Sequence, residues 1–214
     1  MTSQTKETEF DFGEFFAKNQ KAVMSGAAAI VAIGLGYWFW AASSERKADR
    51  AEQAYAAAER SVYSGNPQLA KTDLERVVQR YANTTAGVRG AILLAKQHLQ
   101  ASKPGDAIPV LRSAAGQGAA KPFRTSIYAL LGAAFEAEDK FDSAAAAYRS
   151  AAGATSLTSE KELQDASAAR ALTAAGKKQE ALELWRAIAA RETSPLAGEA
   201  KLRIAELSAT PAKG

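Results

Sequence analysis

The most conspicuous feature of the hydropathy pattern is an uninterrupted apolar stretch near the N-terminus. Residues 22–42 contain no charged side chain, and the uncharged window continues to Ser44, between Lys21 and Glu45. As an α-helix, residues 22–42 extend about 31 Å, which matches the hydrocarbon core of a bilayer. Every later apolar run is soon interrupted by charge. The pattern therefore predicts one transmembrane helix over residues 22–44, followed by a domain outside the membrane.

Aromatic side chains at both ends of this stretch favour an anchor over a cleaved signal peptide. Aromatic residues at the ends of an apolar helix are typical of membrane–water interfaces. The predicted interface anchors are Phe15, Phe16, Tyr37, Trp38 and Trp40. A signal peptide has a shorter apolar region and a basic leader, whereas the leader here, residues 1–21, is net acidic. Basic residues are almost balanced across the helix, so charge by itself leaves the orientation open.

Small residues recur every fourth position within the apolar stretch, at Ala28, Ala32 and Gly36. Such a face lets two helices approach closely in a membrane. The same spacing also arises by chance in an alanine-rich chain. The sequence thus offers a candidate packing face for a partner helix and leaves the alternative open.

After the apolar stretch, a pattern of small and large residues repeats every 37 residues. An alanine recurs once per copy, a larger residue follows it after four positions, and another core-type residue follows after seven. The alanines are Ala70, Ala107, Ala144 and Ala181, and the larger residues are Leu74, Leu111, Tyr148 and Trp185. The residues seven positions on are Val77, Ala114, Ala151 and Ile188. A fixed period of this length indicates stacked supersecondary units, and the spacing is that of packed helices. Residues 45–208 are therefore predicted to form four helix pairs without strands.

Helix boundaries are expected at turn and capping residues. Gly- and Pro-containing segments such as Ser64–Pro67 separate the two helices of a pair. Thr84, Thr158 and Ser194 are predicted N-caps, the last with a proline at the first helical position. Pro109 falls inside a predicted second helix, which is expected to start late or to bend there.

The C-terminal segment does not complete a fifth pair. Residues 195–207 match a first helix without its partner. A terminal helix with a polar outer face caps a repeat array, and residues 209–214 are expected to form a disordered tail.

The third unit carries the clearest family pattern. It combines a bulky–Leu–Gly–aromatic run on its first helix with an Ala–aromatic–Ala run on its second. The pattern residues of this unit are Tyr128, Leu131, Gly132, Phe135, Phe141, Ala144, Tyr148 and Ala151. The pattern resembles a tetratricopeptide repeat, although the period is longer than the usual 34 residues. The fold class implied is all-α, with an N-terminal transmembrane helix followed by an α-solenoid of about four helix pairs and a capping helix.

Composition excludes several kinds of site. The chain has no cysteine, so thiolate catalysis, disulfides and cysteine-ligated metals are excluded. Its single histidine, His98, occupies the core position that Phe135 and Leu172 occupy in later units. The net charge of +4 is not concentrated in any run of four basic residues, so no nucleic-acid partner is predicted. Because no triad, metal cluster or dinucleotide motif is present, neither an enzyme nor a cofactor is predicted.

The remaining candidate site is the face made by the first helices of the pairs, which is the usual binding surface of such arrays. The residues predicted to line a peptide groove there are Tyr55, Arg89, Ile92, Lys96, Leu99 and Arg170. The three cations among them can hold an acidic peptide or a C-terminal carboxylate. Solvated basic residues on an ordinary surface are the alternative interpretation.

The order of segments along the whole chain carries a second resemblance. An aromatic- and Lys-containing leader, a single span ending in GYWFW and four repeats following at once resemble the YfgM-like family of bacterial inner-membrane proteins. The resemblance implies a cytoplasmic N-terminus and a periplasmic repeat domain. It implies an adaptor whose partners are the Sec translocon or other membrane proteins, and periplasmic chaperones or client polypeptides. The alternative is a structural accessory subunit of another inner-membrane complex, docked mainly through its transmembrane helix.

Overall fold

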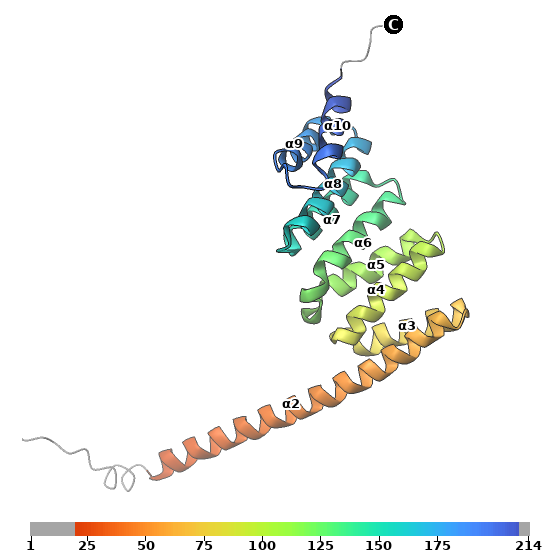
Figure 1. Cartoon of the computed structure of the whole chain (residues 1–214). Helices are drawn as coiled ribbons and strands as arrows, with labels where there is room; N and C mark the ends of the chain where they lie inside the picture. The colour runs from red at the N-terminus through yellow and green to blue at the C-terminus, as the bar shows by residue number, and fades with distance from the viewer. Residues whose placement is uncertain (1–19, 210–214) are drawn as a thin grey trace, which may run out of the picture. The chain divides into compact units, whose positions relative to one another are not determined.

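A computed structural model describes residues 20–209, and every regular element within this range is helical (Figure 1). The helices are α2 (Gln20–Tyr63), α3 (Pro67–Tyr81), α4 (Thr85–Gln100), α5 (Pro104–Ala115), the 3₁₀ helix η1 (Gly118–Phe123), α6 (Arg124–Glu136), α7 (Phe141–Ala154), α8 (Thr158–Ala174), α9 (Lys178–Ala189) and α10 (Ala197–Ser208). The predicted all-α fold class is confirmed. The expectations for the leader before residue 20 and for a tail after Ala209 fall outside the described residues.

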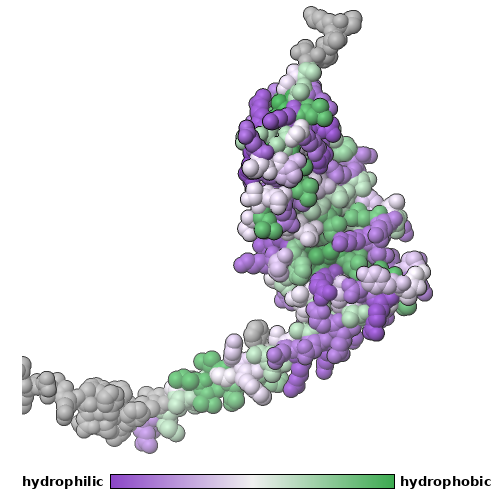
Figure 2. All heavy atoms as spheres, in the orientation of Figure 1, coloured by the Kyte–Doolittle hydropathy of each residue, from purple (hydrophilic) through white to green (hydrophobic). Residues whose placement is uncertain are grey.

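The chain divides into two compact units, Met1–Lys47 and Ala48–Gly214, which are described separately. In the first unit, α2 is apolar and its large side chains are exposed, among them Ile30, Ile33 and Phe39. Figure 2 shows this apolar stretch in green, giving way to purple polar residues farther along the helix. Among the described residues, α2 is the one helix long and apolar enough to cross a membrane, judged by length and composition.

The second unit is an array in which each helix packs against the next one along the chain, from α3 to α10. The last part of α2 supplies the first helix of the first pair, since Ala51, Tyr55 and Ala58 pack with residues of α3 and α4. The pairs are thus α2 with α3, α4 with α5, α6 with α7, and α8 with α9, and α10 packs on α9. The predicted four pairs and final unpaired helix are confirmed.

The residues of the 37-residue pattern form the core. All four repeat alanines and all four larger residues that follow them are buried. Close approach of the two helices of a pair is clearest at Gly132 of α6, where an added Cβ would lie 2.6 Å from Cε1 of Tyr148 in α7. The small residue on the first helix therefore makes room for the large residue on the second.

The turn inside each pair uses one backbone conformation at one repeat position. Gly65, Ser102, Asp139 and Gly176 lie 37 residues apart, and all four have a positive φ, between 55° and 77°. In the last three pairs the residue after this position donates its backbone N–H to a carbonyl five residues earlier, as Lys103 does to His98 at 2.8 Å. This is the Schellman arrangement, which satisfies the last carbonyls of a helix and turns the chain sharply.

Several helix boundaries differ from those predicted. Thr84 caps α4 as expected, accepting a hydrogen bond from the N–H of Gly87 at 3.1 Å. Thr158 is not an N-cap, because α8 begins at Thr158 itself with Leu157 as its cap residue. Ser194 is not an N-cap either, because α10 begins only at Ala197. The Ser194 hydroxyl instead donates to the buried carboxylate of Glu162 at 2.7 Å.

The second pair differs from expectation at Pro109 and after α5. Of the two outcomes predicted for Pro109, a late start or a bend, the late start is wrong, because α5 begins at Pro104 and continues through Pro109. Proline inside a helix removes one backbone donor, and here the side chain of Pro109 lies on an exposed position. The linker after α5 contains η1, which the sequence pattern did not predict.

Candidate protein-binding face

The residues predicted to line a groove lie on the first helices of three pairs. Tyr55 lies on α2, Arg170 lies on α8, and α4 carries Arg89, Ile92, Lys96 and Leu99. We call the surface formed by the outward residues of α4, α6, α8 and the second half of α2 the first-helix face. Within this face, α4 and α6 lie in direct contact.

At one end of this face, Arg89 and Tyr55 are engaged within the chain. The Arg89 guanidinium pairs with the Glu52 carboxylate at 3.1 Å and lies 4.2 Å from the centre of the Tyr55 ring. The Tyr55 hydroxyl donates to Glu59 at 2.9 Å. Burial, followed by the nearby Glu59 carboxylate, raises the pKa of Tyr55 above its usual range. Tyr55 is buried, so its ring supports Arg89 and contributes little open surface.

At the other end, Arg170 is held by the capping helix. Its guanidinium makes a two-pronged contact with Glu199 of α10, with N–O distances of 2.9 to 3.1 Å. It also lies 5.7 Å from the centre of the Trp185 ring. A bidentate pair of this kind fixes the guanidinium geometrically. Arg170 therefore joins the last pair to the cap, and its charge is already matched.

The middle of the face is different, because Lys96 is exposed and makes no ion pair within residues 20–209. Its neighbours one turn away on α4, Ile92 and Leu99, are half-buried and pack against the core. On the adjoining α6, the positions equivalent to Ile92 and Leu99 carry Ala129 and Glu136. The first-helix face thus contains an apolar strip with one unmatched ammonium group.

A tyrosine–carboxylate contact lies beside this strip. The hydroxyl of Tyr148 in α7 donates to Glu136 at 2.7 Å. Burial, and then the Glu136 carboxylate, raises the pKa of Tyr148 far above its usual range. Tyr148 is therefore a neutral hydrogen-bond donor at physiological pH, and it engages the Glu136 carboxylate from within the array.

The sequence interpretation missed the carboxylates that engage the two arginines. Glu52 stands 37 residues before Arg89, so the repeat frame alone places the two at equivalent positions on neighbouring first helices. Glu199 could be linked to Arg170 only once the position of α10 was known. Asp106 was also missed. Its carboxylate lies 3.8 Å from Nδ1 of His98, although it is eight residues away and on another helix.

Two further groups of predicted residues lie on or before α2. Ala28, Ala32 and Gly36 are exposed, and a Cβ added at Gly36 would meet nothing within 4 Å. Tyr37 and Trp38 are exposed as well. The remaining predicted interface anchors are Phe15, Phe16 and Trp40. Phe15 and Phe16, and the side chain of Trp40, lie outside the part of the chain that the structure describes. Across residues 20–209, no three His, Asp or Glu side chains are grouped so as to hold a metal ion.

Comparison with known proteins agrees with this geometry. Residues 13–162 match the family model described as a tetratricopeptide repeat-like domain. The chain is similar in structure to the nearly identical TPR-like repeats of a Podosopora anserina kinesin light chain, with a TM-score of 0.57, 22% identity, and coverage of 74% of this chain and 85% of that one. It is also similar to MamA, with a TM-score of 0.56, 17% identity, and coverage of 70% and 81% respectively. At these identities the likeness shows the fold alone. No curated protein sequence matches the chain.

Proposed function

Because the chain belongs to the tetratricopeptide repeat-like domain family, we propose that it is a membrane-anchored scaffold that holds other polypeptides on its first-helix face. Arrays of helix pairs present an extended surface and generally bind proteins. The observation that carries the proposal is the strip around Lys96, where an exposed, unmatched ammonium group is bordered by Ile92 and Leu99. A partner segment with apolar residues on both sides of an acidic one is complementary to it.

The anchor in this proposal is the apolar part of α2. Its large side chains are exposed, and its length and composition suit a single crossing. We assign the crossing to residues 22–44, the leader to residues 1–21 and the repeat domain to residues 45–208. The apolar side chains that find no partner within the described chain would then be covered by lipid.

The resemblance to the YfgM-like family supports a more specific location. It rests on the aromatic leader, the single span and the four repeats that follow it directly. On this basis we propose a bacterial inner-membrane protein with a cytoplasmic N-terminus and a periplasmic repeat domain, acting beside the Sec translocon on chaperones or client polypeptides. Protease added to spheroplasts should degrade residues 45–214. Protection of this segment until the inner membrane is lysed would contradict the periplasmic assignment.

The scaffold proposal is tested by reversing one charge. The full chain, purified in mild detergent after cross-linking, is used to identify bound proteins by mass spectrometry, and the affinity of the leading partner is then measured with purified components. Lys96→Glu should weaken that affinity on the order of tenfold or more, because like charges would face each other across the interface. Lys178→Glu, an exposed lysine at the start of the second helix α9, is the matched control. Equal affinities for the wild type and Lys96→Glu would refute use of this face.

A second candidate function is a structural subunit that docks through its membrane helix. It is favoured by the open small-residue face at Ala28, Ala32 and Gly36. Replacing these three residues by leucine should abolish co-purification with a membrane complex, while deletion of residues 53–214 should leave it intact. The opposite pattern is expected if the first-helix face provides the main contact.

A further inference from the structure

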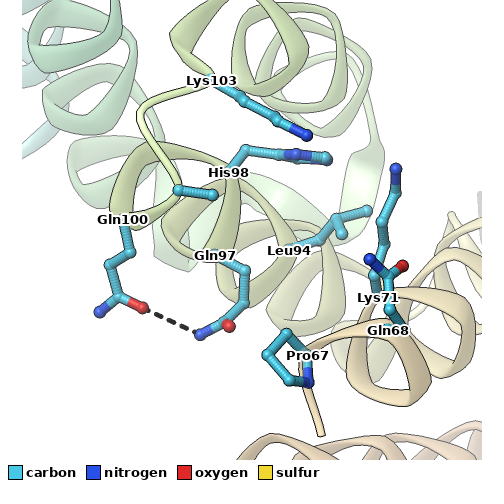
Figure 3. A pocket seen from close by; sticks show the side chains of 9 residues that line it. Pro67, Gln68, Lys71, Leu94, Gln97, His98, Gln100 and Lys103 are labelled. Atoms are coloured by element: carbon cyan, nitrogen blue, oxygen red, sulfur yellow. Dashed lines mark hydrogen bonds between the residues drawn. The ribbon is translucent and has the colours of Figure 1, made fainter.

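A hollow of about 290 Å³ lies between the first and second helix pairs (Figure 3). It is bounded by the first turn of α3, the last turn of α4 and the turn into α5. The residues that line it are Pro67, Gln68, Lys71, Leu94, Gln97, His98, Gln100, Ala101 and Lys103. None of these residues belongs to the strip around Lys96.

Three nitrogen-bearing side chains converge in this hollow. Figure 3 shows Lys103 beside the imidazole of His98, with Lys71 reaching towards them from α3. His98 is buried, with 8% of its surface exposed, and its imidazole makes no hydrogen bond to a residue between 20 and 209, because the Asp106 carboxylate stays 3.8 Å from Nδ1. Gln97 and Gln100 are hydrogen-bonded to each other at 3.1 Å, which leaves a carbonyl oxygen on the one and an amide N–H group on the other for a ligand.

The repeat frame shows that these polar residues replace apolar ones. At the next two junctions between pairs, the position of Lys71 is occupied by Ile108 and Ala145, that of Gln97 by Ala134 and Ala171, and that of His98 by Phe135 and Leu172. All six of these residues are buried. Apolar residues at such positions fill the space between pairs, as a close-packed core requires. Between the first and second pairs, the equivalent space is therefore lined by lysine, histidine and glutamine side chains.

The lysine that follows each turn also differs in its partners from one repeat to the next. Lys177 pairs with Asp142 of the preceding pair at 2.9 Å, and Lys140 pairs with Glu138 at 3.2 Å. Lys103 occupies the same repeat position, but it makes no ion pair within residues 20–209. The residue that corresponds to Asp142 is Gln68, which lines the hollow. Lys103 therefore lacks the carboxylate partner that Asp142 provides to Lys177.

The charges around the hollow favour an anion inside it. Glu75 lies 3.8 Å from the Lys71 ammonium and Asp106 lies 3.8 Å from Nδ1 of His98, but neither carboxylate lines the hollow. The last carbonyls of α4 already accept hydrogen bonds from the backbone N–H groups of residues 101–103. The adjacent start of α3 contributes the positive end of a helix dipole. The walls therefore present donors and positive charge.

From these observations we propose that the hollow between α3, α4 and the turn into α5 binds a carboxylate group of a partner polypeptide. Lys103 and Lys71 would pair with the carboxylate, and the free atoms of Gln97 and Gln100 would meet the adjoining peptide groups. A chain terminus and an acidic side chain present the same chemistry. This site does not depend on use of the first-helix face.

The only histidine of the chain provides a direct probe of this site. Burial lowers the pKa of His98, and Lys71 and Lys103 lower it further, whereas Asp106 and Glu75 raise it. A carboxylate bound in the hollow adds a negative charge beside the imidazole, so the pKa of His98 must rise on binding. Because the sequence has one histidine, its carbon-bound ring protons give unambiguous NMR signals in the full chain.

The experiment follows the His98 signals of the detergent-solubilised full chain during titration with short peptides. The probes are Ala-rich peptides with a free C-terminus, the same peptides amidated, and peptides with an internal Glu and both ends blocked. A free-terminus peptide that raises the pKa of His98 while its amidated form does not identifies a chain terminus, and the blocked Glu peptide acting alone identifies an acidic side chain. No response to any carboxylate, equal response to the amidated peptide, or tighter binding of inorganic phosphate would overturn the proposal.

Variants complete the test. Lys103→Gln and Lys71→Gln should each weaken binding about tenfold, the usual loss for a hydrogen bond to a charged group. Gln68→Asp should abolish binding, because it would recreate the internal partner that Lys177 finds in Asp142. Lys178→Gln, at an exposed position at the start of α9, should leave binding unchanged. Loss of binding in Lys178→Gln, or full retention in Lys103→Gln, would refute the site, whereas a failed Lys96→Glu test would concern the first-helix face alone.

Discussion

At the scale of the residue, the backbone conformation at one repeat position determines the turn between paired helices. All four turn positions have a positive φ, but only two of them, Gly65 and Gly176, are glycine. An L-residue pays about 1–2 kcal/mol in this left-handed region, whereas glycine adopts it freely. Ser102 is therefore held in a conformation that its own chemistry disfavours, by a turn whose hydrogen bonds match those at Gly176.

We expect a reciprocal exchange to reveal this strain. Ser102→Gly should raise the free energy of unfolding by about 0.5–1 kcal/mol, and Gly176→Ser should lower it by about 1 kcal/mol. Urea denaturation followed by circular dichroism measures both changes. Ala101→Gly is the control, because Ala101 has a negative φ of −82° and its replacement relieves no strain. A gain in stability from Ala101→Gly equal to that from Ser102→Gly would contradict the explanation.

A buried histidine at the first junction makes stability depend on pH. Burial lowers the pKa of His98 below the 6.5 of an unfolded chain. Between the folded-state pKa and 6.5, the unfolded state binds more protons than the folded state. The free energy of unfolding must then decrease as the pH falls below 6.5 and be unaffected by this group above it.

The measurement is the free energy of unfolding between pH 7.5 and 5, for the wild type and His98→Phe. Phenylalanine stands at the equivalent buried position in the next pair, so it should fit and should remove the part of the pH dependence that begins at 6.5. Identical pH profiles for the two proteins would show that His98 does not titrate differently in the folded state.

At the scale of the element, the paired helices depend on small residues that admit large ones. A Cβ at Gly132 would lie 2.6 to 2.7 Å from three carbon atoms of the Tyr148 ring. Such an overlap forces the ring or the helix to shift. Such a shift would also disturb the hydrogen bond that the Tyr148 hydroxyl donates to Glu136.

Gly132→Ala should therefore destabilise the protein by about 1–3 kcal/mol through overpacking. Gly153→Ala is the matched control in the neighbouring α7, because an added Cβ there meets nothing within 4 Å. Alanine is the better helix former, so this control should raise the free energy of unfolding by up to about 1 kcal/mol. Thermal denaturation distinguishes the two outcomes by their opposite signs.

The repeat frame predicts only part of the candidate binding face. The frame placed Arg89, Lys96 and Arg170 correctly on first helices, because helical periodicity alone fixes which residues point outward. It did not show that Arg89 and Arg170 are engaged by Glu52 and Glu199. Ion pairs between elements depend on how neighbouring helices are offset, and a hydropathy pattern contains no such information.

At the scale of the whole molecule, the array must be closed at its ends. At the C-terminus, α10 covers α9 with Ala197 and Ala200 buried and Ile204 half-buried against the core. The buried Glu162 fixes the connection, pairing with Arg191 at 2.8 Å and accepting from Ser194 at 2.7 Å. At the N-terminus, the first helix of the array is the second half of α2, whose earlier residues form the proposed anchor.

We expect the anchor to govern partitioning of the protein. The full chain should remain in the membrane fraction through carbonate extraction, whereas residues 45–214 should appear in the soluble fraction, because the exposed apolar side chains of α2 are removed with residues 1–44. Deletion of residues 2–19 alone should leave the protein in the membrane. Immunoblotting of the fractions provides the measurement, and release of the full chain by carbonate would contradict a transmembrane anchor.

The sequence by itself determined the all-α class, the four pairs, the unpaired last helix and the core positions. These follow from local periodicity, because a helix that buries one face has apolar residues at regular intervals along the sequence. Tertiary structure decided the rest. It showed that the Ser194 hydroxyl donates to Glu162 and that Ser194 is not the N-cap of α10. It also showed that two of three candidate cations are already matched, and that Lys103 faces a hollow without its usual carboxylate. Each of these depends on distances between residues far apart in the chain, which arise only when the helices pack.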